Sequence, residues 1–506
     1  MGYMNSDRMC GVLLPVSSLP SEYGIGCFSG SAYKFIDCLY EAGQRIWQIL
    51  PLGPTGYGDS PYQSFSTFAG NPYFISLKEL IREGVLTEEE CREADFGSDP
   101  GAVDYAKLYA NRYPLLRKAY ERSRIAENPD FIRFMDREGY WLKDYALFMA
   151  VKGRFGNAPW SEWAEDIRLR WQNALDYYRR ELYFDIEFQE YMQFKFYEQW
   201  NRLKEYANQK GILIVGDIPI YVAMDSADAW ASPWLFRLDE NNEPIQVAGC
   251  PPDGFSATGQ LWGNPLYNWD VHRRSGYEWW IRRMEHCFAM YDIVRIDHFR
   301  GFDEFYAIPY GDDTAENGWW EKGPGMELFQ AIAGRLGPKA IIAEDLGFIT
   351  DSVRQLVRDS GYPNMKVIQF AFDVRDTGDP GDYLPHNYDR NCAAYTGTHD
   401  NETLYGWFLA LPEEAKAEVR AYIGRPEADA HAVCETLIRL VMGSVAKLCV
   451  IPMQDYLGLD NSARMNKPST LGNNWKWRMK TLPGGELLAA MRELAAVYGR
   501  ADRRKS

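Results

Sequence analysis

The sequence predicts an α/β fold, a (β/α)8 TIM barrel that forms one domain over residues 1–506. Three observations predict it. The chain is long enough for a barrel of about 250 residues with large insertions, apolar runs recur along it, and helical patterns separate most of these runs. Near-continuous apolar runs are typical of parallel strands buried on both faces. Eight runs have this character: 11–15, 46–52, 212–218, 293–297, 340–346, 366–372, 393–397 and 448–454.

Helical patterns between the runs predict the layer that covers the barrel. Residues 30–43 end on glycine, which commonly stops a helix. Residues 274–290 place large apolar side chains at helical spacing. Further helices are predicted at 325–336, 350–359, 412–423, 428–445 and 484–498. The connection between the sixth and seventh runs has the weakest helical pattern of the eight units.

Two long segments interrupt the repeating unit. Residues 75–210 are rich in Leu, Glu, Arg, Tyr and Trp with helical periodicity, which predicts a mainly helical subdomain. Residues 222–271 hold many Pro, Gly, Asn and Trp residues, which predicts an ordered loop subdomain over the top of the barrel. A loop of that length in a compact domain usually has a function.

Composition and charge exclude several kinds of partner. The net charge is −16, which argues against binding to nucleic acid or to an anionic membrane. No segment is apolar enough to span a bilayer, and no signal peptide is visible. The nine cysteines are scattered and odd in number, which indicates free thiols in a reducing compartment. We therefore expect a cytoplasmic protein, and we expect it to be a monomer.

Polar side chains follow almost every apolar run, where a β/α barrel carries its active site. A random barrel would not place so many carboxylates and imidazoles there. The polar groups at or just past the run ends are the segment 58–63, Asp217, Arg295, Asp297, His298, Glu344, Asp345, Asp373, His399, Asp400, Asn401, Gln454 and Asp455.

Three of these carboxylates, Asp297, Glu344 and Asp400, suit cleavage of a glycosidic bond. One carboxylate attacks the anomeric carbon, while a second, with a raised pKa, protonates the leaving oxygen and later deprotonates the acceptor. Arg295 and Asp297 are two residues apart on one strand and so point to the same side, which lets the arginine hold the carboxylate ionised. Activity should then fall at low pH as Asp297 protonates and at high pH as Glu344 loses its proton.

Other interpretations of the same residues stay open at this point. Asp297 could cap a helix, Glu344 and Asp345 could take part in structural ion pairs, and His298 could be an ordinary loop histidine. Phosphate-loop, zinc-protease and nucleophile-elbow motifs are absent, and the six histidines are dispersed. The sequence therefore predicts neither a metal nor a cofactor. An inactive glucan-binding barrel and a barrel isomerase are the alternatives, but the first predicts loss of a carboxylate and the second needs phosphate or metal ligands.

Several segments resemble a known family. The motifs VRIDHFRG (294–301), IIAEDLG (341–347) and TGTHDNET (396–403) resemble strand-end motifs of the α-amylase superfamily. The resemblance narrows to amylomaltases, the bacterial 4-α-glucanotransferases also called disproportionating enzymes. It rests on long runs at 13–26, 47–75, 216–230, 251–269 and 451–478 and spans residues 11 to about 480.

The resemblance implies a retaining reaction without a cofactor, acting on maltooligosaccharides, amylose or starch. It implies Asp297 as nucleophile, Glu344 as general acid/base, and Asp400 as the carboxylate that holds the sugar's 2- and 3-hydroxyls. An α-glucan hydrolase of the α-amylase type is the alternative, because water or a sugar hydroxyl can complete the reaction.

The resemblance also implies which residues bind the substrate. Residues 253–262 match a loop that folds over the bound glucan, and Cys250 beside it departs from the small apolar residue common in the family. The implied substrate-binding residues are Tyr62, Asp217, Asp253, Phe255, Gln260, Trp262, Arg295, His298 and His399, with Asn466 on the acceptor side.

Overall fold

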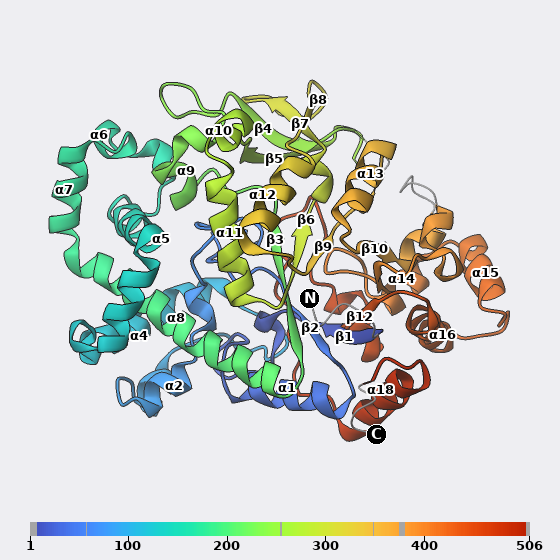
Figure 1. Cartoon of the computed structure of the whole chain (residues 1–506). Helices are drawn as coiled ribbons and strands as arrows, with labels where there is room; N and C mark the ends of the chain where they lie inside the picture. Colours follow the sequence, from blue (N-terminus) through green and yellow to red (C-terminus); the bar gives the residue numbers. More distant parts are fainter. Residues whose placement is uncertain (1–7, 57, 253–255, 348, 374–379, 502–506) are drawn as a thin grey trace.

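A computed structural model describes residues 8–56, 58–252, 256–347, 349–373 and 380–501, and its centre is a ring of eight parallel strands (Figure 1). Each strand pairs with the next one of the ring along the chain, in the order β10-β11-β12-β1-β2-β3-β6-β9. All eight predicted runs contribute a strand. The strands are β1 Met9–Leu13, β2 Ile46–Gln48, β3 Leu213–Pro219, β6 Ile293–Asp297, β9 Ile341–Ala343, β10 Asn364–Val367, β11 Cys392–Tyr395 and β12 Leu448–Pro452.

The ring closes between β9 and β10. The backbone N–H of Ala343 donates to the carbonyl of Pro363 at 2.9 Å, and the N–H of Met365 donates to the carboxylate of Asp345, also at 2.9 Å. Asp345 therefore joins two strands of the barrel, whereas its neighbour Glu344 points elsewhere. The predicted (β/α)8 barrel is confirmed.

The barrel interior is a packed core to which every strand contributes at least one buried apolar side chain. Strand residues alternate between the interior and the outer layer, as a period of two requires. On β6, Ile293 belongs to this interior core, and Arg295, two residues on, donates to the sulfur of Met365 at 3.3 Å. The charged groups at the strand ends thus lie directly above the apolar core of the barrel, which keeps water away from them on that side.

Helices cover the outside of the barrel, and the predicted helical segments are all helical. Local signals explain their ends: Thr350 caps α13 by accepting from the N–H of Val353, and Gly361 ends it with a φ of 68°. The covering helices are α1 Gly30–Glu41, α11 Glu278–Met290, α12 Met326–Leu336, α13 Asp351–Ser360, α14 Leu404–Ala410, α15 Glu413–Tyr422, α16 Ala430–Gly443 and α18 Gly485–Val497.

The unit between β10 and β11 lacks an α-helix in its described part. Short 3-10 turns at Ile368–Phe372, Pro380–Tyr383 and Pro385–Asn387 take the place of the covering helix there. This agrees with the weak helical pattern of the segment.

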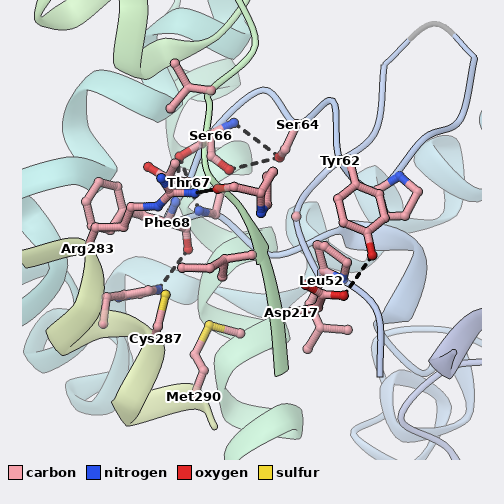
Figure 2. A pocket seen from close by; sticks show the side chains of 18 of the residues that line it. Leu52, Tyr62, Ser64, Ser66, Thr67, Phe68, Asp217, Arg283, Cys287 and Met290 are labelled. Atoms are coloured by element: carbon pink, nitrogen blue, oxygen red, sulfur yellow. Dashed lines mark hydrogen bonds between the residues drawn. The ribbon is translucent and has the colours of Figure 1, made fainter. Parts of the chain in front are cut away.

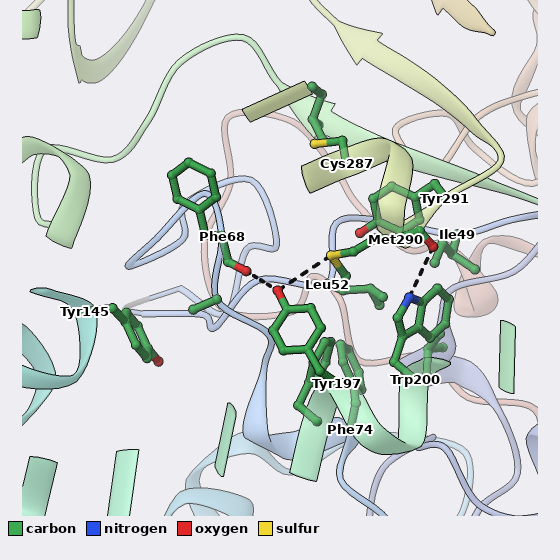
Figure 3. Packing of buried hydrophobic residues seen from close by; sticks show 14 of the residues in the cluster. Ile49, Leu52, Phe68, Phe74, Tyr145, Tyr197, Trp200, Cys287, Met290 and Tyr291 are labelled. Atoms are coloured by element: carbon green, nitrogen blue, oxygen red, sulfur yellow. Dashed lines mark hydrogen bonds between the residues drawn. The ribbon is translucent and has the colours of Figure 1, made fainter. Parts of the chain in front are cut away.

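Residues 75–210 form helices that pack against the loop between β2 and the insertion. Gln193 on α8 donates to the carbonyl of Gly70 and accepts from its N–H, at 2.9 and 2.7 Å. Tyr197 donates to the carbonyl of Phe68 in the same loop (Figure 3). The insertion therefore holds the loop that also carries Tyr62. Its helices are α2 Leu77–Arg82, α3 Glu88–Glu93, α4 Tyr105–Ser123, α5 Pro129–Arg154, α6 Glu165–Arg168, α7 Gln172–Glu181 and α8 Tyr183–Gln209.

A second, four-stranded antiparallel sheet lies over the carboxyl ends of the barrel strands (Figure 1). Its order is β5-β4-β7-β8, with bounds Gln260–Pro265, Gln246–Cys250, Glu304–Pro309 and Trp319–Lys322. Residues 222–271, expected to be an ordered loop, therefore contain two strands, as well as the short helices α9 Ala227–Ala231 and α10, which spans Trp269–Arg274. These strands were not predicted because β4 pairs with β7, which comes after β6 in the chain, and a pairing between distant segments leaves no local pattern.

All nine cysteines are free thiols, and seven of them are buried. In the part of the chain that the structure describes, no helix is long and apolar enough to cross a membrane.

Candidate active site

Arg295 lies between two carboxylates at the top of the barrel. It donates to both oxygens of Asp217 at 2.7 Å and to an oxygen of Asp297 at 2.9 Å. Asp217 and Arg295 are direct partners in the β3–β6 ladder, so the strand register creates their ion pair. Asp217 is fully buried and the Asp297 side chain is 30% exposed. The buried pair therefore anchors the arginine, which in turn orients the more accessible carboxylate.

Tyr62 connects this ion network to the end of β11. Its hydroxyl donates to Asp217 at 2.8 Å, as Figure 2 shows, and lies 3.5 Å from Nδ1 of His399. The tyrosine ring also stacks on the imidazole, with centroids 5.1 Å apart and planes at 19°. One side of the site is thus formed by three side chains in mutual contact, those of Tyr62, Asp217 and His399.

Asp400 is held on both oxygens. Nε2 of His399 lies 3.3 Å from Oδ2, and the amide of Asn466 donates to Oδ1 at 2.6 Å. Burial opposes ionisation of this carboxylate, but the charge of His399 and the hydrogen bonds from His399 and Asn466 outweigh it and lower the pKa of Asp400. The structure therefore places Asn466, expected on the acceptor side, directly against a candidate catalytic carboxylate.

Glu344 has the opposite environment. Burial and the nearby charge of Asp297 raise its pKa to about 7, although Arg295 and two backbone N–H donors act in the other direction. Those donors are the N–H groups of His298, at 2.6 Å, and Leu346, at 2.9 Å. A carboxyl group with this pKa can give and take a proton near neutral pH.

His298 follows Asp297 in the left-handed conformation, with a φ of 54°, and this turn directs its N–H at Glu344. Its ring meets the indole of Trp262 edge to face, with centroids 4.9 Å apart, and the Trp262 N–H donates to Gln260 at 3.1 Å. Strand β5 thereby brings Gln260 and Trp262 to the strand ends of the barrel. Asp253 and Phe255 lie outside the described residues.

A cavity of about 50 Å³ lies behind Tyr62 and Asp217, between the strand ends and α11 (Figure 2). Its walls are mainly apolar and include Leu52, Cys287 and Met290. Its size suits water rather than a sugar ring.

Two further residues near the site were not among the predicted site residues, and their only signal in the sequence is that they lie in the family-like run 451–478. Trp475 tilts against both Tyr62 and His399, with each pair of ring centroids 5.9 Å apart. Arg464 donates to the backbone carbonyls of Asp400 and Asn466 at 2.7 Å. Both come from the long loop after β12, where no strand end or helix periodicity predicts a position.

No metal site accompanies these groups in the described part of the chain, where no cluster of three or more His, Cys, Asp or Glu side chains could hold a metal ion.

Replacing Arg295 with methionine should lower the free energy of unfolding by about 3–5 kcal/mol, because it leaves Asp217 buried without its cation. The shift of the urea unfolding midpoint measures this change.

The double variant Arg295→Met/Asp217→Asn is the matched control and should recover much of the loss, since it also removes the buried negative charge. If Arg295→Met alone is as stable as the wild type, the Arg295–Asp217 ion pair does not anchor this part of the barrel.

The chain matches the family model described as 4-alpha-glucanotransferase over residues 14–483. The chain belongs to this family. It is 50% identical over 475 residues to the 4-alpha-glucanotransferase of Streptococcus pneumoniae, covering 93% of both chains. It is 47% identical over 490 residues to that of Clostridium butyricum, covering 96% of this chain and all of the relative.

Solved structures agree with the family assignment. The amylomaltase from Streptococcus agalactiae in complex with acarbose superimposes with a TM-score of 0.93 at 43% identity, over 98% of this chain and all of the other. The amylomaltase from Corynebacterium glutamicum has a TM-score of 0.73 at 20% identity, over 98% of this chain and 75% of the other, and supports the fold alone.

Proposed function

We propose that this family member is a 4-α-glucanotransferase. It transfers α-1,4-glucan segments from a donor maltooligosaccharide or starch chain to the 4-hydroxyl of an acceptor glucan or glucose. The reaction passes through a covalent glycosyl-enzyme and retains the anomeric configuration. The family match over residues 14–483 and the acarbose complex of the S. agalactiae amylomaltase support a glucan substrate.

The observation that carries the proposal is the contrast between Asp297 and Glu344. Asp297 is paired with Arg295 at 2.9 Å and its side chain is 30% exposed, so the carboxylate is held in place and open to a substrate, as a nucleophile must be. Glu344 is partly buried beside it, and its pKa is raised to about 7, which favours the protonated form that a general acid needs. Two carboxylates whose environments separate them in this way suit the two roles of a retaining glycosidic mechanism.

In the first step Asp297 attacks the anomeric carbon of the donor, and the proton of Glu344 goes to the departing glycosidic oxygen. A glycosyl ester on Asp297 results, and Glu344 is left ionised. In the second step Glu344 takes the proton of the acceptor 4-hydroxyl. That oxygen attacks the anomeric carbon, the ester bond breaks, and Asp297 leaves as a carboxylate.

The other site residues bind the sugar. Asp400, held ionised by His399 and Asn466, accepts hydrogen bonds from the 2- and 3-hydroxyls and stabilises the oxocarbenium-like transition state. Trp262 and Gln260 on β5 face the glucan chain. The further substrate contacts proposed are Tyr62, Asp217, Arg295, His298 and His399, together with Asp253 and Phe255 of the segment outside the described residues.

Incubation with maltotriose tests transfer against hydrolysis. We expect glucose and a ladder of maltooligosaccharides longer than maltotriose, with no rise in total reducing ends, because each transfer breaks one glycosidic bond and makes another. Chromatography resolves the ladder, and a reducing-sugar assay on the same samples counts the ends.

The alternative, an α-glucan hydrolase of the α-amylase type, predicts the opposite pattern. A steady rise in reducing ends with only short products would show that water, not a sugar hydroxyl, completes the reaction. The sheet β5-β4-β7-β8 over the barrel favours transfer, because a cover of this kind can exclude water and hold an acceptor in place.

The substrates proposed are maltooligosaccharides, amylose and starch. We also propose a cytoplasmic monomer: nine free thiols suit a reducing compartment. Gel filtration with light scattering checks the oligomeric state.

A further inference from the structure

The segment 396–404, which is the loop between β11 and α14 together with the first residue of α14, carries His399 and Asp400 to the top of the barrel. Within the loop, Asn401 accepts hydrogen bonds from the N–H and the hydroxyl of Thr398, both at 2.9 Å. This turn shapes the tip of the loop. It does not fix the loop to the barrel, so other contacts must set where Asp400 stands.

Asp455 joins the two ends of this loop. It lies in α17 (Met453–Tyr456), the single turn that follows β12, and is 5% exposed. One carboxylate oxygen accepts from the hydroxyl of Thr396 at 2.5 Å, where β11 ends. The other accepts from the N–H of Leu404 at 2.8 Å, where α14 begins. One buried side chain is thus hydrogen-bonded to both ends of the segment that connects the strand to the helix.

The charge of Asp455 strengthens both contacts. Burial raises its pKa to about 6, while the bonds from Leu404 and Thr396 oppose this shift, so the group is mainly ionised above neutral pH. Hydrogen bonds to an ionised acceptor are roughly twice as strong as neutral ones. Leu404 and Thr396 are themselves fully buried, so neither donor can turn to water if the carboxylate is removed.

Other contacts hold one loop residue or two adjacent ones. Asn466 donates to the carbonyl of His399 at 3.1 Å and to the carboxylate of Asp400 at 2.6 Å, and Arg464 donates to the carbonyl of Asp400 at 2.7 Å. Asn461 donates to the carboxylate of Glu402 at 2.8 Å and accepts from the hydroxyl of Thr403 at 3.4 Å. Asp455 differs from these contacts because it restrains the distance between the strand end and the helix start.

We propose that Asp455 is the positioning residue that fixes the loop 396–404 and so places Asp400 against the sugar. Asp455 does not touch the substrate in this proposal, which rests on the role proposed for Asp400. A carboxylate that acts in the transition state must be held within a fraction of an ångström, and a displacement of about 1 Å can cost 10²-fold in rate.

Replacing Asp455 with alanine should therefore lower kcat for maltotriose disproportionation by about 100-fold, with a much smaller change in KM. Asp455→Asn keeps the shape and one acceptor for Leu404, so it should stay within about 10-fold of the wild type. Thr396→Val removes only one bond and should fall between the two.

Asp292→Ala is the matched control. Asp292 also accepts from a backbone N–H, that of Ile214 at 2.8 Å, and from the amide of Asn208 at 2.8 Å, but it lies at the opposite end of the barrel. This variant should lower the melting temperature and leave kcat within about two-fold, since that face of the barrel serves stability.

Hydrogen–deuterium exchange gives a readout that does not depend on the activity. Peptides that cover 396–404 should exchange faster in Asp455→Ala than in the wild type and in Asp292→Ala. The double variant Thr396→Val/Asp455→Ala should lose no more kcat than Asp455→Ala alone, because both substitutions break one restraint.

Two results would overturn the proposal: unchanged loop exchange in Asp455→Ala, or a kcat loss no larger than that of Asp292→Ala. Faster exchange of the loop together with an active Asp400→Ala variant would instead count against the role of Asp400, and hence against the proposed function. If Asp455→Ala does not fold, Asp455→Asn and Thr396→Val still test the proposal. Thr396→Val should lose more kcat than Asp455→Asn, and wild-type kcat in Thr396→Val would contradict the proposal.

Discussion

Asp297→Asn is expected to lower kcat for glucan transfer by at least about 10⁴-fold, because an amide cannot form the glycosyl ester. The substitution keeps the size of the side chain and its place beside Arg295. Maltotriose disproportionation measures the loss. A maltotriosyl fluoride donor followed by acid quenching and intact mass measurement should detect a glycosyl-enzyme in the wild type and none in the variant.

Asp303→Asn is the control for this substitution. Asp303 follows the same strand, accepts from the hydroxyl of Ser352 at 2.6 Å, and lies outside the network around Arg295. The variant should keep kcat within a few-fold of the wild type. Full activity, or a normal adduct, in Asp297→Asn would exclude Asp297 as the nucleophile.

The eight barrel strands could be predicted because each is buried on both faces. A strand such as β12, Leu448–Pro452, is apolar at every position, and this pattern does not depend on its neighbours. The strand limits were less predictable: the sixth run was expected to extend to residue 372, but β10 ends at Val367 and a 3-10 turn continues the apolar run. Apolar residues suit either conformation, so hydropathy alone does not separate a strand from a 3-10 turn here.

The second sheet could not be predicted in the same way. Its central pairing joins β4 to β7, with the β6 strand of the barrel between them in sequence. Strand β8, Trp319–Lys322, is largely exposed and shows no apolar run. Such strands exist because their partners bury them in part, and a local pattern does not contain that information.

The site was predictable where one strand supplies two groups. A period of two placed Arg295 and Asp297 on one side, and the structure has them in contact. The pairing of Arg295 with Asp217 depends on the register of β3 against β6, and the support of Asp400 by Asn466 depends on a loop from the end of the chain. The register of β3 against β6 and the position of the loop that carries Asn466 are set by packing of the whole barrel. Local residue patterns alone therefore could not predict these contacts.

Glu344→Gln is expected to lower kcat with maltotriose by about 10³-fold, because the amide can neither protonate the leaving oxygen nor take the proton of the acceptor. The first step with a glycosyl fluoride should survive, since fluoride departs without a proton, so the glycosyl-enzyme should accumulate. Azide, an anion that needs no base, should restore turnover and yield a glycosyl azide of retained configuration. Asp297→Asn is the control: it should show neither the adduct nor the rescue.

The pH dependence gives a second, independent measurement on the same residue. Because the pKa of Glu344 is raised to about 7, the acid form disappears as the pH rises through this value, and wild-type kcat should fall there. The variant Glu344→Gln should not show this fall of kcat at high pH.

The raised pKa of Glu344 also makes the stability of the protein depend on pH. The folded state holds the proton of Glu344 more tightly than the unfolded chain, where the ordinary pKa is 4.5, so the contribution of Glu344 to stability is full below that pH and is lost as the pH rises to about 7. At pH 8 Glu344→Gln should therefore melt at a higher temperature than the wild type. If Glu344→Gln is inactive but melts no higher than the wild type at pH 8, the ionised carboxylate of Glu344 does not destabilise the folded state. The pKa of Glu344 would then not be raised, and its assignment as the general acid would lose its physical basis.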